Sequence, residues 1–165
     1  MNIIEAILAV DSEFGLSKDG KIPWNNKIDM KFFRDKTINN IVVMGSKTLL
    51  SLPNKTPLKD RLNIILTKNK HHYLINYSKY DNIIFLNYEE LIDFFSIKQD
   101  KIIYIIGGKE IYNLLLPFCN RIWITILNQN YQCDLSMTIN LDKYNTRKIY
   151  HNQDINIYLL SEKTE

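Results

Sequence analysis

IIYIIGGKEIY, at residues 102–112, is a run of aliphatic residues and one tyrosine, followed by two glycines and then by a helical pattern. The run has the length and composition of a buried strand, and the residues after Gly108 are typical of a helix. Glycines at such a junction let the backbone approach a ligand, and the free amides of the helix start can bind a phosphate. Gly107-Gly108 lacks the three spaced glycines of the full dinucleotide fingerprint, so a purely structural turn is an equal alternative.

A second junction of the same kind lies at residues 42–48, VVMGSKT. A short apolar strand again ends at a glycine, Gly45, and polar residues follow where a helix is expected to begin. Two phosphate-compatible turns in one small sheet suit a dinucleotide.

Short apolar runs alternate with helical stretches through most of the chain. Runs of buried-strand length lie at residues 3–10, 41–44, 63–66, 83–86 and 102–106, and helices between most of them predict a parallel α/β core. A helix is expected over residues 88–97, because Asn87 can cap it and Glu90 completes a capping box, and Pro117 ends the next helix. The runs at 122–127, 148–150 and 155–160 have no helical segment between them, so they are expected to add antiparallel edge strands.

The composition is that of an ordinary soluble globular protein. The 165 residues are 45% apolar and 24% charged, without an internal repeat or linker, so a single domain over residues 1–165 is expected. The net charge of +3 is small and the lysines are scattered, which argues against a nucleic-acid partner. No apolar run approaches the roughly 20 residues of a membrane span, and no signal-peptide pattern is present, so the expected location is cytoplasmic.

Neither a metal site nor a disulfide is expected. Cys119 and Cys133 lie outside any metal-ligand spacing, which favours a reduced, intracellular chain. His71 and His72 fall in a polar stretch between strands without matching ligands at helical spacing, and we expect a solvated loop there.

An isolated carboxylate, Asp29, stands out among apolar residues. The stretch at 26–37 has the pattern of a helix in which Asp29 shares one face with Phe32, Phe33 and Lys36. An unpaired carboxylate among aromatic rings is costly, and it is retained mainly where a cationic or proton-exchanging ligand needs it. The alternative is a slightly rotated helix that turns Asp29 towards water, as for most aspartates.

The motifs, taken in order, resemble those of the dihydrofolate reductase family. The series runs from AVD at 9–11 through GKIPW at 20–24 and Asp29, VMGSKT at 43–48, residues 57–61 before NIIL at 63–66, and IGG at 106–108 with Ile111-Tyr112, to Thr125 and Asp134. It spans nearly the whole chain, and the length also matches. The resemblance implies an enzyme that uses NADPH to reduce 7,8-dihydrofolate to tetrahydrofolate. It also implies a central, mostly parallel eight-stranded sheet with an antiparallel C-terminal edge and flanking helices.

The resemblance also implies catalytic roles for three residues. Asp29 matches the family's one catalytic carboxylate, which binds the 2-amino and N3 edge of the pterin and favours protonation at N5 during hydride transfer to C6. Thr125 would orient Asp29, and Trp24 would hold an ordered water near the pterin. From the residues alone, Thr125 is equally well an ordinary strand residue and Trp24 a core residue.

Further positions match the family's binding residues. On the substrate side the apolar walls correspond to Met30, Phe33, Leu52 and Leu58, the backbone acceptors to Ile7 and Ile106, and the clamp on the α-carboxylate to Arg61. A solvated side chain is the alternative for that arginine. The cofactor-contacting positions correspond to Ala9, Leu16, Ile22, Gly45, Ser46, Lys47, Thr48, Leu66, Thr67, Lys68, Gly107, Gly108, Lys109, Glu110, Ile111 and Tyr112. By the same resemblance the Gly107-Gly108 peptide is expected to be cis.

Five positions depart from the family pattern. Ser17 replaces a usual glycine in the mobile loop over the active site, Leu49 replaces a common aromatic residue, and Cys133 replaces a glycine. Ser46 and Glu110 stand close to the expected 2′-phosphate of the cofactor, where many relatives carry basic or neutral residues. We therefore predict a weaker preference for NADPH over NADH.

Two alternatives remain beside a dihydrofolate reductase. A riboflavin-pathway reductase shares the fold and the glycine turns but needs no acid after Pro23-Trp24, so Asp29 argues against it. A non-catalytic binding relative is the other alternative, against which the intact Asp29, Trp24 and Thr125 argue. We expect a monomer unless the chain was cut from a longer bifunctional protein.

Overall fold

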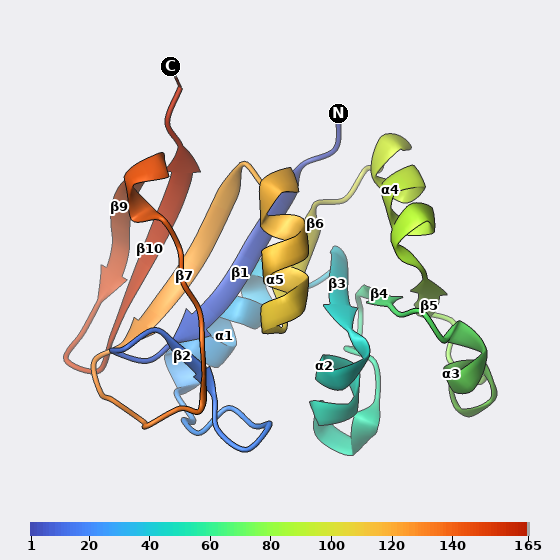
Figure 1. Cartoon of the computed structure of the whole chain (residues 1–165), viewed down its shortest axis with the longest axis horizontal. Helices are drawn as coiled ribbons and strands as arrows, with labels where there is room; N and C mark the ends of the chain where they lie inside the picture. Colours follow the sequence, from blue (N-terminus) through green and yellow to red (C-terminus); the bar gives the residue numbers. More distant parts are fainter. Residues whose placement is uncertain (165) are drawn as a thin grey trace.

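The computed structural model describes residues 1–164, and one eight-stranded sheet forms its centre (Figure 1). The strands of this sheet are β1 (Ile4–Val10), β3 (Ile41–Gly45), β4 (Leu62–Leu66), β5 (Ile83–Leu86), β6 (Ile103–Gly107), β7 (Arg121–Leu127), β9 (Tyr144–His151) and β10 (Ile155–Glu162). Their order across the sheet is β5-β4-β3-β6-β1-β7-β10-β9, which places the first strand of the chain near the middle.

Most of the sheet is parallel. β5, β4, β3, β6, β1 and β7 run in one direction, with partners such as Ile4 beside Ile103 and Ala6 beside Ile122. β10 pairs antiparallel with β7, and β9 pairs antiparallel with β10. The predicted sheet, mostly parallel with an antiparallel C-terminal edge, is therefore confirmed. The expectation of an antiparallel edge strand at 122–127 is wrong, because this run is the inner strand β7 and pairs parallel with β1. The helical segment between β6 and β7 returns the chain to the same direction.

Helices cover both faces of the sheet, because the inner strands carry apolar side chains on both sides. α4 (Tyr88–Ser96) and α5 (Lys109–Leu115) place Leu91 and Leu115 in one core cluster with alternate β1 residues such as Ala6. α1 (Lys27–Thr37), α2 (Ser46–Ser51) and α3 (Lys70–Tyr77) contribute to a second cluster around Ile7, on the opposite face. In Figure 1, α5 lies in front of the sheet and α1 behind it. Within residues 1–164, no helix combines the length and the apolar character needed to cross a membrane.

The loop predicted at His71 and His72 is wrong, since both residues lie on α3, where they are exposed. The helix forms because Tyr73 and Tyr77, four residues apart, pack on Phe85 with ring centroids 5.5 and 5.7 Å away. The histidines occupy the polar side of this helix. The expectation that they are solvated agrees with their exposure.

The C-terminal part contains more structure than the sequence indicates. β9 extends over Tyr144–His151 rather than 148–150, and a 3-10 turn, η3 (Leu141–Lys143), precedes it, so the expected absence of helical segments there is wrong. β9 is exposed along nearly its whole length, so it lacks the apolar pattern of an inner strand. A separate two-stranded sheet joins β2 (Gly15–Ser17) to β8 (Leu135–Ser136).

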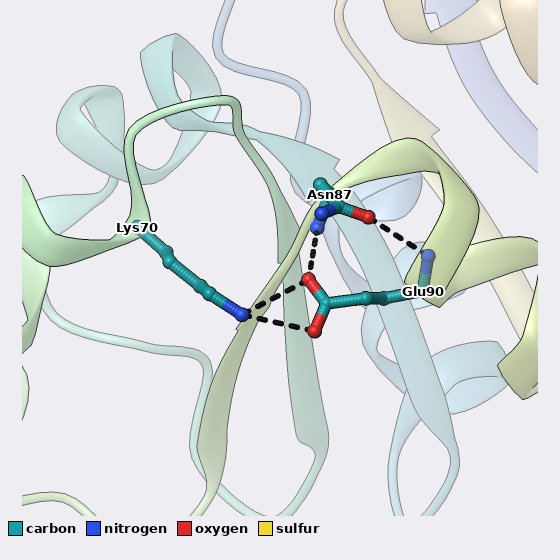
Figure 2. Close-up of polar contacts among 3 residues, drawn as sticks. All are labelled: Lys70, Asn87 and Glu90. Carbon is teal, nitrogen blue, oxygen red and sulfur yellow. Dashed lines mark hydrogen bonds and ion pairs between the residues drawn. The ribbon is translucent and has the colours of Figure 1, made fainter.

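The starts of α3 and α4 are tied together by charge (Figure 2). The Asn87 side chain accepts from the Glu90 amide at 2.8 Å and Glu90 Oε1 accepts from the Asn87 amide at 3.0 Å, so the predicted capping box is confirmed. Lys70 Nζ on α3 donates to both Glu90 oxygens at 3.0 and 2.9 Å. The Asn87 amide and the Lys70 ammonium lower the pKa of Glu90. Because the ammonium of Lys70 is already paired with the Glu90 carboxylate, Lys70 is a poor candidate for binding phosphate.

Candidate active site

The two glycine junctions lie side by side at one edge of the sheet. The carboxyl ends of parallel strands meet at the same edge, and Met44 at the end of β3 pairs with Gly107 at the end of β6. A Cβ placed on Gly108 would lie 3.7 Å from Thr48 Oγ1, so α2 begins close to the second junction. The Gly107-Gly108 peptide is cis, as expected.

Glycine is required at these junctions because α5 packs directly on them. A Cβ on Gly45 would lie 3.0 Å from Ile111 Cγ1, and a Cβ on Gly107 would lie 3.0 Å from the Tyr112 ring. Gly107 also has a φ of +113°, which side-chain-bearing residues rarely adopt. The two junctions, here called the glycine cradle, therefore carry no side chain towards α5, and backbone amides at helix starts of this kind can bind phosphates.

Asp29 lies in the first turn of α1, which Asn26 caps by accepting from the Asp29 amide at 2.9 Å. Asp29, Phe32 and Phe33 are all half-buried, so the shared helix face predicted for them is confirmed. Burial raises the pKa of the Asp29 carboxyl, and a hydrogen bond from the Thr125 hydroxyl opposes that rise. The structure thus places a carboxylate with an elevated pKa beside a single hydroxyl donor.

Strand and helix residues converge around this carboxylate. Thr125 is 2% exposed on β7, two residues beyond Trp123 on the same face. Tyr112 on α5 is buried and donates through its hydroxyl to the Ile7 carbonyl at 2.8 Å. Burial raises the pKa of Tyr112 first, and the nearby Asp29 charge raises it further. Asp29, Thr125, Tyr112 and Ile7 therefore belong to one site.

Trp24 has a packing role in the structure. It is 8% exposed and belongs to a cluster with Leu127, Ile155 and Ile157. Its ring lies 5.4 Å from that of Tyr131, at an interplanar angle of 57°. The core-packing role that the sequence allows for Trp24 is therefore confirmed, and its contact with an ordered water stays a prediction.

Arg61 is held at the C-terminal end of α1 rather than lying free in solvent. Its Nη1 donates to Thr37 Oγ1 at 3.0 Å, and its Nε donates to the Lys59 carbonyl at 2.9 Å. Burial, followed by the charge of nearby Arg34, lowers the pKa of its guanidinium. A half-buried arginine beside a second cation is well suited to a carboxylate ligand.

The other predicted substrate residues fall into two groups. Phe33, Leu52, Leu58 and Ile106 are partly buried against the core cluster that contains Ile7. Met30 is 59% exposed and lies outside that cluster. The structure therefore gathers four of the five apolar positions on the face of the sheet that α1 covers.

Only part of the predicted cofactor set lies at the glycine cradle. Those in contact with it or at its rim are Gly45, Ser46, Thr48, Gly107, Gly108, Lys109, Ile111 and Tyr112. Leu66 ends β4, which pairs with β3, and Thr67 and Lys68 follow it. Ala9 lies near the end of β1 and Leu16 on β2, whereas Ile22 is 64% exposed. Lys47, Lys68 and Glu110 are exposed, and none of these three forms an ion pair with another residue between 1 and 164.

Sequence reasoning missed the buried carboxylate of Asp11. It accepts from the amides of Glu13, Gly15 and Tyr131 at 2.7 to 3.0 Å, and the Cys133 thiol is a fourth partner. Burial alone would raise its pKa, but these hydrogen bonds outweigh burial and lower the pKa. The available signal was an aspartate directly after a buried strand and four residues before a glycine, a pattern typical of a side-chain-closed turn.

Comparison with known proteins identifies the family. The dihydrofolate reductase family model matches residues 3–159. Dihydrofolate reductase of Ureaplasma parvum is 32% identical over 148 residues, covering 87% of this chain and 88% of that protein. Bifunctional dihydrofolate reductase-thymidylate synthase 2 of Arabidopsis thaliana is 34% identical over 146 residues, covering 79% of this chain and 25% of that protein.

A solved structure shows the same fold. Dihydrofolate reductase from Enterococcus faecalis, complexed with NADP(H) and RAB-propyl, superposes with a TM-score of 0.81 at 23% identity, covering 98% of this chain and 97% of that one. The chain spans about a quarter of the bifunctional plant relative and most of the Ureaplasma one. These matches favour the reductase interpretation over the riboflavin-pathway alternative. The chain belongs to the dihydrofolate reductase family, the NADPH-dependent oxidoreductases that convert 7,8-dihydrofolate into tetrahydrofolate.

Proposed function

We propose that this chain reduces 7,8-dihydrofolate at the carboxyl ends of β1, β6 and β7, with Asp29 as the catalytic carboxylate. The observation that carries the proposal is the half-buried Asp29 on α1, whose pKa burial raises while Thr125 hydrogen-bonds to it. A carboxyl group with an elevated pKa next to bare backbone turns is typical of a site that exchanges protons.

The residues around Asp29 have complementary tasks in this reaction. NADPH, when bound, supplies the hydride. Asp29 accepts hydrogen bonds from the 2-amino and N3 edge of the pterin and thereby favours protonation at N5, while Thr125 fixes the orientation of the carboxylate. The Ile7 carbonyl keeps one lone pair free beside the bond from Tyr112, so it can accept from the same ring. Phe33, Leu52 and Leu58 exclude water from the apolar part of the substrate.

The glycine cradle and its lysines would hold the dinucleotide. Gly45 and Gly107 let α5 pack directly on the two turns, and Thr48 lies close to Gly108 in the second turn. Lys47 and Lys68 supply positive charge for a 2′-phosphate, whereas Glu110 on the first turn of α5 opposes it. Two cations against one anion favour NADPH over NADH, by less than in a relative that carries an arginine there.

The remaining expectations follow from the family and the single sheet. We propose a single domain that acts as a monomer, in line with the similar length of the Ureaplasma protein. A cytoplasmic location accords with a reduced chain whose two cysteines are unpaired in the described structure.

The direct test follows NADPH oxidation by absorbance, with and without dihydrofolate, in the wild type, Asp29→Asn and Asp35→Asn. Asp35 is the matched control because it lies on the same helix, exposed, in a surface pair with Lys31. Asp29→Asn should lose roughly 100-fold or more of the activity at neutral pH. Wild-type turnover in a folded Asp29→Asn variant would remove Asp29 from the mechanism, and oxidation without dihydrofolate would point to another substrate.

A further inference from the structure

A second buried carboxylate, Glu5 on β1, lies behind the site and has no part in the proposed chemistry. It is 4% exposed and accepts from Trp123 Nε1 at 2.9 Å. The same Trp123 ring has Lys36 Nζ of α1 over its face, 3.5 Å from the centroid. Phe32 of α1 lies 6.0 Å from the Trp123 ring, and Lys36 Nζ lies 6.0 Å from the Phe32 ring. Glu5, Trp123 and Lys36, here called the rear network, therefore connect β1, β7 and α1.

The rear network and the active site use the same three elements, β1, β7 and α1, at two successive positions along them. Trp123 and Thr125 are two residues apart on β7, as are Glu5 and Ile7 on β1, so each pair faces the same side of the sheet. Asp29 and Lys36 are seven residues apart on α1 and share one helix face. Since Thr125 meets Asp29 and Trp123 meets Lys36, α1 contacts β7 at two successive points.

Charge makes the rear contact specific. Burial lowers the pKa of Lys36, the Glu5 charge raises it and the Arg121 charge lowers it, so the ammonium lies within the field of the buried carboxylate while it contacts the Trp123 ring. Burial and the Glu5 charge raise the pKa of Tyr104, on the neighbouring strand, to about 12. A buried carboxylate that loses its hydrogen-bond partner is costly, so the network favours one arrangement of α1 over slightly shifted ones.

We infer that Glu5, Trp123 and Lys36 are positioning residues for the reaction, which hold α1 against β7 and so set the place and solvation of the Asp29 carboxylate. This inference rests on the proposed catalytic function of Asp29. The groups that face Asp29 itself are Thr125 from β7 and Tyr112 from α5. Neither belongs to the rear network, so a change in that network reaches Asp29 indirectly, through α1 or through the strand β7 that carries both Trp123 and Thr125.

The test compares two substitutions at the same position. Glu5→Gln keeps an oxygen that accepts from Trp123 Nε1, whereas Glu5→Leu removes the acceptor and leaves a buried N–H without a partner. We expect Glu5→Leu to lower kcat/KM for dihydrofolate by roughly tenfold, because small displacements of a reacting group are costly. The pKa of Asp29 should fall towards its ordinary value of 3.8, as the carboxylate gains water. Glu5→Gln should restore both quantities.

Two measurements report on Asp29: the pH profile of kcat/KM, and the pH titration of its carboxyl carbon resonance by NMR. Leu91→Ala, a core change in α4 on the opposite face of the sheet, is the control for lost stability alone. If Glu5→Leu fails to fold, Trp123→Phe removes the same hydrogen bond and keeps an aromatic ring under Lys36. The inference is overturned if the folded variant loses stability as Leu91→Ala does while both measurements match the wild type. Failure of the proposed function would give a different result, namely full activity in Asp29→Asn. The NMR titration reports on the environment of Asp29 whether or not this residue is catalytic, so it distinguishes the two failures.

Discussion

Replacing Tyr112 with phenylalanine would delete one hydroxyl that joins α5 to β1 at the active site. The hydroxyl is buried and donates to the Ile7 carbonyl at 2.8 Å, where we place an acceptor for the pterin. Burial and the Asp29 charge raise the pKa of Tyr112, so the hydroxyl remains protonated and keeps donating at neutral pH. The substitution removes this donor while preserving the ring that packs on Gly107.

The magnitude follows from the environment of the bond. A buried carbonyl that loses its partner costs about 1–3 kcal/mol. For a chain of this length each 1 kcal/mol shifts Tm by about 2–4 °C, so Tyr112→Phe should lower Tm by about 2–12 °C. The released Ile7 carbonyl is also less well oriented towards the substrate, and we expect kcat/KM for dihydrofolate to fall roughly tenfold, which corresponds to about 1.4 kcal/mol of transition-state stabilisation.

The assay pairs thermal unfolding with steady-state kinetics, and Asn2→Ala is the matched control. Asn2 donates to the carbonyls of Phe95 and Ile97 at 2.7 and 2.9 Å and accepts from the Gln99 amide at 2.7 Å, before the start of β1 and at the opposite edge of the sheet from the site. It should lower Tm without changing kcat/KM. Equal kinetics in the two variants would refute the reasoning, because the Tyr112 hydroxyl would then stabilise the fold and nothing more.

Arg61→Leu should raise KM for dihydrofolate far more than it changes kcat, because the guanidinium binds ground and transition states alike; an unaltered KM would place the carboxylate clamp elsewhere. Glu110→Arg should tighten NADPH with little effect on NADH, and titrations that move both affinities equally would show that Glu110 does not face the 2′-phosphate. The folded-state pKa of Asp29 is raised, so its ionisation destabilises the fold, and this loss of stability grows as pH rises above 3.8. Asp29→Asn should therefore be more stable than the wild type at pH 7 and equally stable below pH 3.8. Chemical denaturation of both proteins at the two pH values checks this. The pKa of Asp11 is lowered instead, so its carboxylate contributes stability above 3.8 that is lost as pH falls through the folded-state pKa, and Asp11→Asn should lower Tm at pH 7 while the difference narrows in acid.

The sheet was predictable because its inner strands are buried on both faces and leave continuous apolar runs in the sequence. The glycine junctions were also visible, since only glycine tolerates the contacts that Ile111 and Tyr112 make there. α3 was missed because its buried side is made of two tyrosines among polar residues, which weakens the helical pattern. β9 was truncated in the prediction because an exposed edge strand has no apolar alternation to detect.

Periodicity placed Asp29 on the correct face of its helix, but the groups that support it were out of reach. Glu5 and Trp123 are 118 positions apart in the chain, and the hydrogen-bonded pair Arg61 and Thr37 is 24 positions apart. Such pairs leave no local pattern, because the strand order alone brings them together. The family resemblance could match individual positions, whereas the rear network consists of residues that no motif contains.

The central place of β1 has a consequence for how the chain acquires its structure. Its partners are β6 and β7, with Ile4 beside Ile103 and Ala6 beside Ile122. β1 can therefore complete its hydrogen bonds only after about 120 residues of the chain are available. Loops of this length close slowly, and until they close, β1 exposes both edges and an apolar face on each side. During synthesis the N-terminal strand is thus made first and paired among the last, which leaves it available to chaperones and to wrong partners for most of that time. We therefore expect the yield of folded protein to be more sensitive to a polar substitution in β1 than to the same substitution in β9, which is added at a finished edge.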